Sequence, residues 1–237
     1  MKAATIFSGV GRLARVVPPS LAVLAACRGA PPSSLPSAAP AASTAPAPAV
    51  SAAFRCNLLL GVGVTGEWFE AGFERIVDDA RWEAIIKPHT SLTEWGDAND
   101  PVWSLEPSSR CLEQPNTPDR VLFTAMKWEY KSADEWAAGL RAALAAIEQH
   151  FPSARRVELL TMIRAPHDVS CGNAMSVVEP FVDEAVARVA AERPALVAVG
   201  PRLEAPSCEL FKNDGPHFTD AGRTEIARVI GEHYAKE

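Results

Sequence analysis

The hydrophobic residues of this 237-residue chain gather, from residue 57 onward, in short runs separated by polar and glycine-containing segments. Continuous apolar runs of about four to eight residues, rich in Val, Ile and Leu, are typical of strands buried on both faces of a parallel sheet. Such runs predict strands at residues 57–62, 82–86, 120–126, 156–163 and 196–199.

Between these runs, apolar residues recur at helical spacing. Residues 132–135, Ser-Ala-Asp-Glu, form a capping box that predicts the start of a helix. The apolar side of this helix continues at intervals of three or four residues, through Trp136, Leu140, Leu144, Ile147 and Phe151. Further helices are predicted from about 178 to 192 and from about 220 to 234, the latter with Ile226, Val229, Ile230 and His233 on its inner side.

The alternation of strands and helices predicts a fold of the α/β class. We expect a three-layer α/β/α domain built around a mainly parallel sheet, as in flavodoxin-like folds. Functional groups of such sheets collect at the carboxyl ends of the strands. Residues 61–68, expected as a loop after the first strand, are therefore predicted to meet the later loop that holds Asp214 and His217 at one edge of the sheet.

The first 27 residues are expected to be a lipoprotein signal peptide. Three basic residues and no acidic one precede an apolar run at 16–26, which is too short to span a membrane as a mature helix and indicates an export signal. The run ends in Leu-Ala-Ala-Cys, which resembles a bacterial lipobox with Cys27 as the lipidated residue. The alternative is an ordinary signal peptide, cut later among the small residues.

Residues 28–53 consist almost entirely of Ala, Pro and Ser, and they are expected to form an extended linker. Residues 54–237 are long enough for one domain with a full core. The sequence thus predicts an exported lipoprotein of the cell envelope or, with the ordinary signal peptide, a secreted protein. The membrane is expected to be contacted through the lipid anchor only.

The cysteines support export. Once Cys27 is set aside as the lipid site, four cysteines remain, and four cysteines allow three pairings. The pairing of neighbours along the chain, Cys56–Cys111 and Cys171–Cys208, is favoured. No metal site is predicted, because the chain has no Cys-x-x-Cys motif and its five histidines are scattered.

The sequence argues against two further kinds of ligand, nucleic acids and dinucleotide cofactors. Without the three basic residues before Cys27, the chain has 20 basic against 29 acidic residues, so nucleic acid is not expected as a partner. Gly61, Gly63 and Gly66 match the spacing of a dinucleotide-binding loop, but the acid expected about twenty residues later does not end a clear second strand. No cofactor is expected.

The most informative motif lies near the C-terminus, where Asp214 stands three residues before His217. A carboxylate at this spacing can bond one imidazole nitrogen and leave the other free as a base. Residues 214–222, Asp-Gly-Pro-His-Phe-Thr-Asp-Ala-Gly, resemble the last block of the SGNH/GDSL hydrolases, Asp-x-x-His followed by Leu-Thr and a helix. The first strand and residues 61–65 resemble the first block of that family, which reads Gly-Asp-Ser-(Ile/Leu)-Thr.

The resemblance covers roughly residues 56–236, and it departs from the family where the chemistry should be. It implies a nucleophilic Ser at the position of Gly63, which has no side chain. The Asn that helps to hold the oxyanion is missing from residues 124–130. Gly96 is the candidate for the oxyanion glycine of the second block. By resemblance, the chain is an esterase-type hydrolase without its nucleophile.

Three accounts of the Asp214–His217 pair remain open. The first is a non-catalytic descendant, or pseudoenzyme, that kept the fold and holds a ligand. The second is a hydrolase with a displaced nucleophile, for which Thr65 is the nearest hydroxyl. In the third, His217 activates water directly, helped by acids such as Glu67 or Glu129.

The six tryptophans are expected mostly in the core, Trp82 and Trp136 especially, while Trp95, Trp103 and Trp128 are candidates for stacking on a sugar ring. The leading hypothesis is a catalytically degraded monomer that binds a carbohydrate or a small-molecule ester of the envelope or the extracellular space. The alternatives are an active esterase, with His217 oriented by Asp214, and a structural envelope lipoprotein.

Overall fold

The computed structural model describes residues 54–236, except residues 109–110, 114, 125, 128, 167–170, 172–177 and 214–215. The predicted lipidation site Cys27 and the linker 28–53 lie outside the described residues, and so do Asp214 and Trp128.

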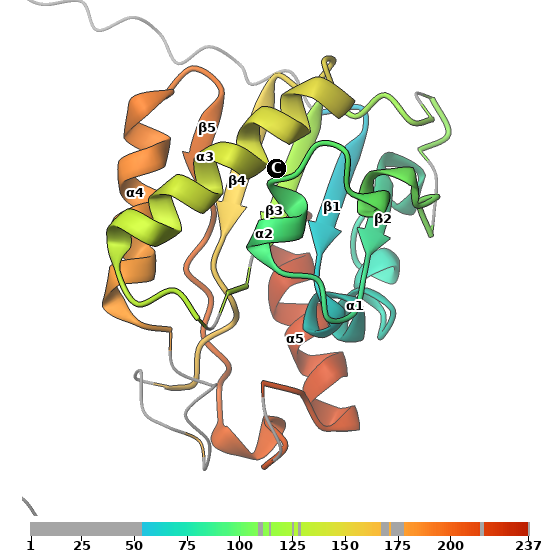
Figure 1. Ribbon diagram of the computed structural model, residues 1–237. Helices are drawn as coiled ribbons and strands as arrows, with labels where there is room; N and C mark the ends of the chain where they lie inside the picture. The colour runs from blue at the N-terminus through green and yellow to red at the C-terminus, as the bar shows by residue number, and fades with distance from the viewer. Residues whose placement is uncertain are drawn as a thin grey trace, which may run out of the picture. The chain divides into compact units, whose positions relative to one another are not determined.

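In the part of the chain described, five parallel strands form one sheet in the order β2-β1-β3-β4-β5 (Figure 1). Each predicted strand is present, and most are shorter than their apolar runs: β1 Asn57–Gly61, β2 Trp82–Ile86, β3 Arg120–Thr124, β4 Arg156–Leu160 and β5 Val197–Val199. The chain therefore has the predicted α/β fold with a parallel sheet.

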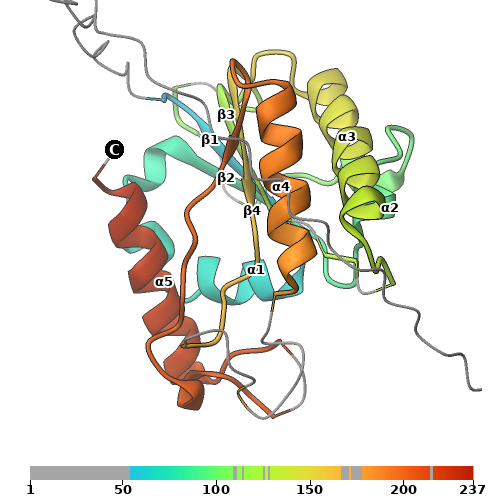
Figure 2. The ribbon, with the colours of Figure 1, turned by 90° about the vertical axis from the view of Figure 1, so that its left-hand side faces the viewer.

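Helices cover both faces of the sheet (Figures 1 and 2). One core contains α2 Leu92–Trp95, α3 Ala133–His150 and α4 Pro180–Glu192. The other contains α1 Gly63–Phe69 and α5 Asp220–Tyr234. Successive residues of β1 serve the two cores in turn, because side chains of a strand alternate between the faces of a sheet. The three-layer α/β/α prediction is confirmed.

Two of the three predicted helix starts are confirmed by their caps, and the third helix begins at Pro180 without a side-chain cap. The Ser132 hydroxyl accepts a hydrogen bond from the Glu135 amide, and the Thr219 hydroxyl accepts one from the Gly222 amide. The inner side of α5 differs from the prediction, since Val229 and His233 are only half-buried. The buried face is rotated toward Ala227 and Tyr234, because the Tyr234 ring packs edge-on against Trp82.

The segment after β1 is also different from the prediction. Residues 63–69 form helix α1, not a loop, although Gly63, Gly66 and the β-branched residues between them have low helix propensity. Burial of Trp68 and Phe69 against Phe73 compensates for this low propensity. Short 3-10 turns, which the hydrophobic pattern did not predict, lie at 73–75, 79–81, 101–104 and 208–210.

Both predicted disulfides are present, Cys56–Cys111 and Cys171–Cys208. Glu83 lies within 4.8 Å of the first pair, but its carboxylate accepts the backbone N–H groups of Cys111 and Asn116 at 3.1 and 2.9 Å. The carboxylate therefore fixes the crosslinked loop. Among the described residues, no helix has the length and apolar character needed to cross a membrane.

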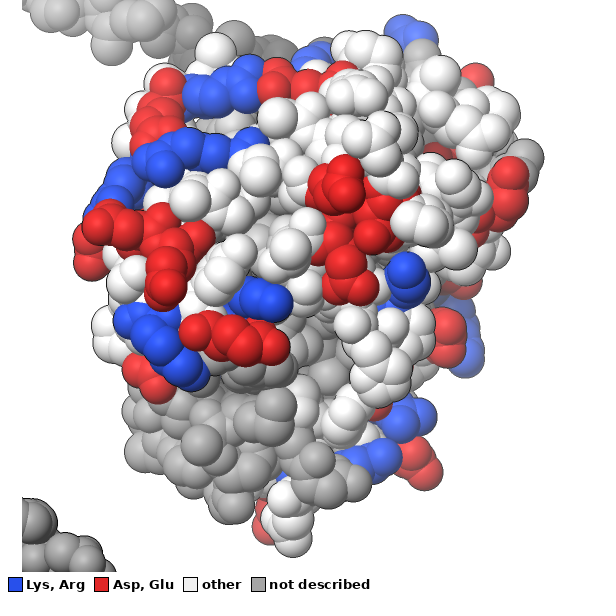
Figure 3. Space-filling model, viewed as in Figure 1, with Lys and Arg blue, Asp and Glu red and all other residues white. Residues whose placement is uncertain are grey.

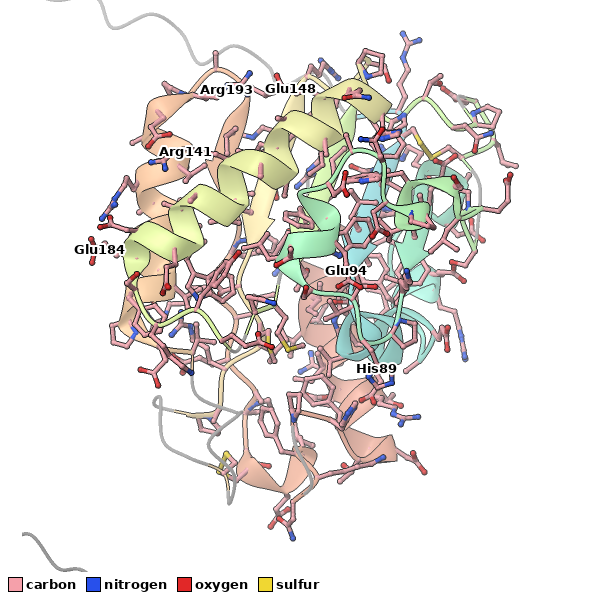
Figure 4. The ribbon with its side chains drawn as sticks, viewed as in Figure 1. His89, Glu94, Arg141, Glu148, Glu184 and Arg193 are labelled. Atoms are coloured by element: carbon pink, nitrogen blue, oxygen red, sulfur yellow. A yellow bond between two sulfur atoms is a disulfide. The ribbon has the colours of Figure 1, made fainter. Side chains whose placement is uncertain are left out.

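Ion pairs connect the two outer helices α3 and α4. On the face shown in Figure 3, basic and acidic side chains alternate over these helices. Arg193 contacts Glu148 at 2.6 Å, and Arg141 contacts Glu192 at 2.6 and 2.8 Å (Figure 4 labels all but Glu192). Exposed pairs of this kind each contribute little to stability, because solvent screens them.

Candidate functional site

The structure brings together two polar side chains that are 150 residues apart in the sequence. The Nδ1 atom of His217 lies 2.7 Å from Oε1 of Glu67. Glu67 projects from α1, which follows β1, and His217 precedes α5. The prediction that the segment after the first strand meets the loop of His217 at one edge of the sheet is confirmed.

Local packing fixes both partners of this contact. The neighbours of Glu67 in α1, Gly66 and Trp68, are buried, so the helix is held with Glu67 at its margin. On the other side, Phe218 bridges to Phe211, and the His217 carbonyl accepts the Lys212 amide at 2.8 Å. These backbone contacts hold the imidazole beside α1.

The surroundings of Glu67 fix the tautomer of the imidazole. The second carboxylate oxygen, Oε2, accepts the backbone N–H of Phe218 at 2.9 Å, and the Arg223 guanidinium lies 3.6 Å from Oε1. An ionised carboxylate can only accept hydrogen bonds, so Nδ1 of His217 donates to Glu67, and in the neutral imidazole Nε2 is then the nitrogen that carries the lone pair. Among the described residues, the imidazole of His217 makes no other hydrogen bond or ion pair, and its side chain is 44% exposed while that of Glu67 is 14% exposed.

Gly63 lies one helical turn before Glu67, at the first residue of α1. A Cβ added at Gly63 would meet Pro88 at 3.7 Å, which is ordinary van der Waals contact. The backbone therefore has room for a side chain at the position where the hydrolase resemblance expects a Ser. His89, which follows Pro88, is exposed and lies beside α1 in Figure 4.

Thr65, the candidate for a displaced nucleophile, points away from the surface. Its side chain is 1% exposed, and its hydroxyl is buried without a hydrogen-bond partner among the described residues. It lines a cavity of about 20 Å³ between α1, β4 and Phe218, which is room for about one water molecule. The structure thus does not present Thr65 to a substrate beside His217.

The other candidates lie elsewhere. The Gly96 amide donates to helix carbonyls at Leu92 and Thr93, and the close approach of its Cα to Ala142 packs α2 on α3, so this amide is not available to an oxyanion. Glu129 is exposed and pairs with Lys127 at 3.4 Å. Hydrogen bonding with backbone, and then the Lys127 ammonium, lower the pKa of Glu129.

Two of the three tryptophans proposed for sugar stacking have rings that other parts of the protein cover, wholly or on one side. Trp95 is fully buried in α2, and Trp103 stacks on the imidazole of His150 with ring centres 4.7 Å apart. The expectation is wrong for Trp95, because its ring is buried in the core, whereas Trp103 is half-buried, with its ring stacked on His150. Trp82 and Trp136 are buried as predicted.

Sequence reasoning did not assign Glu67 as the partner of His217. It named Glu67 only as a possible helper in water activation and gave the orienting role to Asp214, which lies outside the described residues. One signal was present: Glu67 is the only charged residue between Gly61 and Phe69.

Comparisons with known proteins assign the chain to no family. No protein-family model matches it, and no match is found among curated proteins. Among solved structures, 14 chains match. One of these is described as the structure of the Salmonella ser. Paratyphi A lipopolysaccharide acetyltransferase periplasmic domain; it is 10% identical, covers 76% of this chain and 83% of that chain, and has a TM-score of 0.40.

Proposed function

We propose that this protein is a hydrolase-type α/β domain that retains the base half of a hydrolytic site, lacks the nucleophile half, and binds a carbohydrate or ester without turning it over. The observation that carries the proposal is the contact between His217 and Glu67, beside a position 63 that has no side chain. In a triad enzyme, loss of the nucleophile alone lowers kcat by about a millionfold.

The chemistry of the imidazole suggests the kind of ligand. In its neutral form with the proton on Nδ1, His217 offers Nε2 as a hydrogen-bond acceptor, and the side chain is 44% exposed. A ligand hydroxyl can donate to this nitrogen. A hydroxyl-rich ligand such as a carbohydrate of the envelope or the extracellular space fits this requirement.

Activation of water is the second candidate, and the Glu67 carboxylate favours it. In this mechanism, Nε2 removes a proton from water while the resulting hydroxide attacks the ester carbonyl, and Glu67 stabilises the imidazolium that forms. The proton then passes to the departing alcohol. The two candidates use the same pair of residues and differ in whether the parent protein has turnover.

The test is hydrolysis of p-nitrophenyl acetate and of glucose pentaacetate by the purified chain. If the binding proposal is right, the parent protein hydrolyses neither ester, and the Gly63→Ser variant gains ester hydrolysis. Gly63→Ala is the matched control, because it adds the same Cβ without the hydroxyl and should remain silent. Titration of glucose pentaacetate into the parent should also shift the side-chain NMR signals of His217.

Two outcomes oppose the binding proposal. Turnover by the parent that disappears in His217→Ala would establish water activation. A ligand titration that leaves the His217 signals unchanged, together with a silent Gly63→Ser variant, would show that this surface holds no functional site.

We propose that the protein is exported and anchored through a lipid on Cys27. The two disulfides fit an oxidising compartment. Labelling of cells with a palmitate analogue should mark the natural chain and fail with Cys27→Ala. Absence of label on both would exclude the anchor and favour secretion.

A further inference from the structure

A second site is suggested at the opposite end of the sheet from His217. A cavity of about 710 Å³ opens where the strands begin, and the first residues of β1, β2, β3 and β4 line it: Asn57, Trp82, Arg120 and Arg156. Figure 2 shows the C-terminal end of α5 beside this end of the sheet. The volume is in the usual range for small-molecule sites.

Three of the residues that line the cavity, Arg120, Glu158 and Tyr234, form a buried cluster. Arg120 is 3% exposed, lies 2.8 Å from the Glu158 carboxylate, and has its guanidinium 4.9 Å from the ring centres of both Phe54 and Tyr234. The Tyr234 hydroxyl donates to the other oxygen of Glu158 at 3.2 Å. The carboxylate of Glu158 is thus neutralised by Arg120 and does not balance a second cation.

A second guanidinium lies next to this cluster. Arg156 pairs in register with Arg120 on the neighbouring strand, so both side chains leave the same face of the sheet. Within the described residues, Arg156 has no ion pair and no side-chain hydrogen bond. Arg156 therefore places at the cavity wall a positive charge that no carboxylate of the described residues pairs with.

The remaining charges of the cavity do not cancel this excess. Arg81 pairs with Asp78 at 2.9 Å, and Arg155 pairs with Asp119 at 3.1 Å. The arginines of these pairs are 39% and 49% exposed, so solvent screens the pairs and they hold their partners weakly. In total, four arginines and two acids line the cavity of a chain whose overall charge is −6.

We propose that this cavity binds a sugar-sized organic anion, whose carboxylate or phosphate is held by Arg156. A guanidinium matches the planar carboxylate or the phosphate oxygens through two parallel N–H bonds. Arg81 and Arg155 lie at the same cavity and add long-range attraction for the anion. The site is independent of His217.

The experiment is isothermal titration calorimetry on the full chain with three ligands that share one ring. D-Glucuronate carries a carboxylate, glucose 6-phosphate carries a phosphate, and D-glucose is the neutral counterpart. Binding of either anion without binding of glucose is the expected result, and the better anion identifies the source of the charge. Arg156→Gln should weaken that binding by about tenfold or more, since a charge-assisted pair is lost.

Controls separate recognition from folding. Within the described residues the Arg156 side chain makes no ion pair or hydrogen bond, so Arg156→Gln should leave the midpoint of thermal unfolding equal to that of the parent. Arg228→Gln, which removes a guanidinium paired with Glu225 and Glu232 on α5 outside the cavity, should leave the binding unchanged. His217→Ala should also leave it unchanged.

The proposal is overturned by failure of both anions to bind, by equal binding of glucose, or by anion binding that Arg156→Gln does not weaken. Since this titration does not involve Gly63 or His217, its failure leaves the ester assays of the first site unaffected.

Discussion

Glu67 determines which nitrogen of His217 faces the solvent. Its two oxygens are engaged separately, one by Nδ1 of the imidazole and one by the Phe218 amide, so the carboxylate is fixed before any ligand arrives. A preorganised pair of this kind does not reorganise when it binds.

The tautomer can be tested directly. Glu67→Ala should remove the preference for the proton on Nδ1, because the acceptor is lost, and the proton should shift toward Nε2. The measurement is the pair of side-chain ¹⁵N shifts of His217 in long-range ¹H–¹⁵N spectra. Glu70→Ala, an exposed carboxylate one residue after α1, is the matched control and should leave the shifts as they are. Equal spectra for Glu67→Ala and the parent would contradict the hydrogen bond between Glu67 and His217.

Two glycines should respond in opposite ways to the same substitution. Gly63→Ala places its Cβ in open contact with Pro88 and should change the free energy of unfolding by less than about 1 kcal/mol. Gly222→Ala places its Cβ 2.1 Å from the carbonyl oxygen of Leu210, a backbone atom, and should destabilise by about 1–3 kcal/mol or more. Urea denaturation measures both, and similar midpoints for the two variants would be evidence against this packing.

At the scale of elements, the sequence was sufficient where a pattern was strong and local. The strands at 82–86 and 120–124 and the helix that starts after Ser132 follow from continuous apolar runs and a cap. Helix α1 could not be predicted in this way, because its stability comes from the burial of Trp68 and Phe69 and not from the helix propensity of its residues.

Of the two residues of the candidate site, only His217 could be predicted from the sequence, because the contact with Glu67 depends on tertiary structure. His217 stands in a recognisable motif, and its partner Glu67 comes from α1, far away in sequence. No spacing rule connects two residues that only the assembled sheet brings together. The Arg120–Arg156 pair is equally hidden, since it depends on the register of β3 against β4.

The ion pairs between α3 and α4 should make stability depend on pH. Hydrogen bonds from Arg193 lower the pKa of Glu148, and those from Arg141 lower the pKa of Glu192. A carboxyl whose pKa is lower in the folded state stabilises the fold above its unfolded pKa of about 4.3, and this contribution is lost as the pH falls through the folded value.

Arg193→Gln should therefore lower the urea midpoint at pH 6, and should lower it less at pH 3. Lys236→Gln removes an exposed charge that makes no ion pair with the described residues, and it serves as the control for net charge. The effect should be small, because solvent screens the pair. A loss that is equal at both pH values would show that Arg193 acts through packing alone.

For the whole molecule, the disulfides set how far the unfolded chain can expand. The bridges close loops with sequence separations of 55 and 37 residues. Each should stabilise the fold by about 2–4 kcal/mol, mainly by restricting the unfolded chain.

Reduction should accordingly lower the urea midpoint of the natural chain, and the Cys56→Ala, Cys111→Ala double variant should reproduce part of that loss. Cys27→Ala removes no bridge between the described cysteines and is the control. Identical midpoints with and without reductant would mean that the bridges do not constrain the unfolded chain.

The entry of the chain into the sheet has a mechanical consequence. The chain passes from Phe54 directly into β1, which lies between β2 and β3 in the sheet. Cys56 is crosslinked there, and the Asp119 carboxylate holds the amides of Arg55 and Cys56. A pulling force applied at residue 54 along β1 would load two rows of hydrogen bonds in shear, and the Cys56–Cys111 bridge would carry part of it to the loop that holds Cys111.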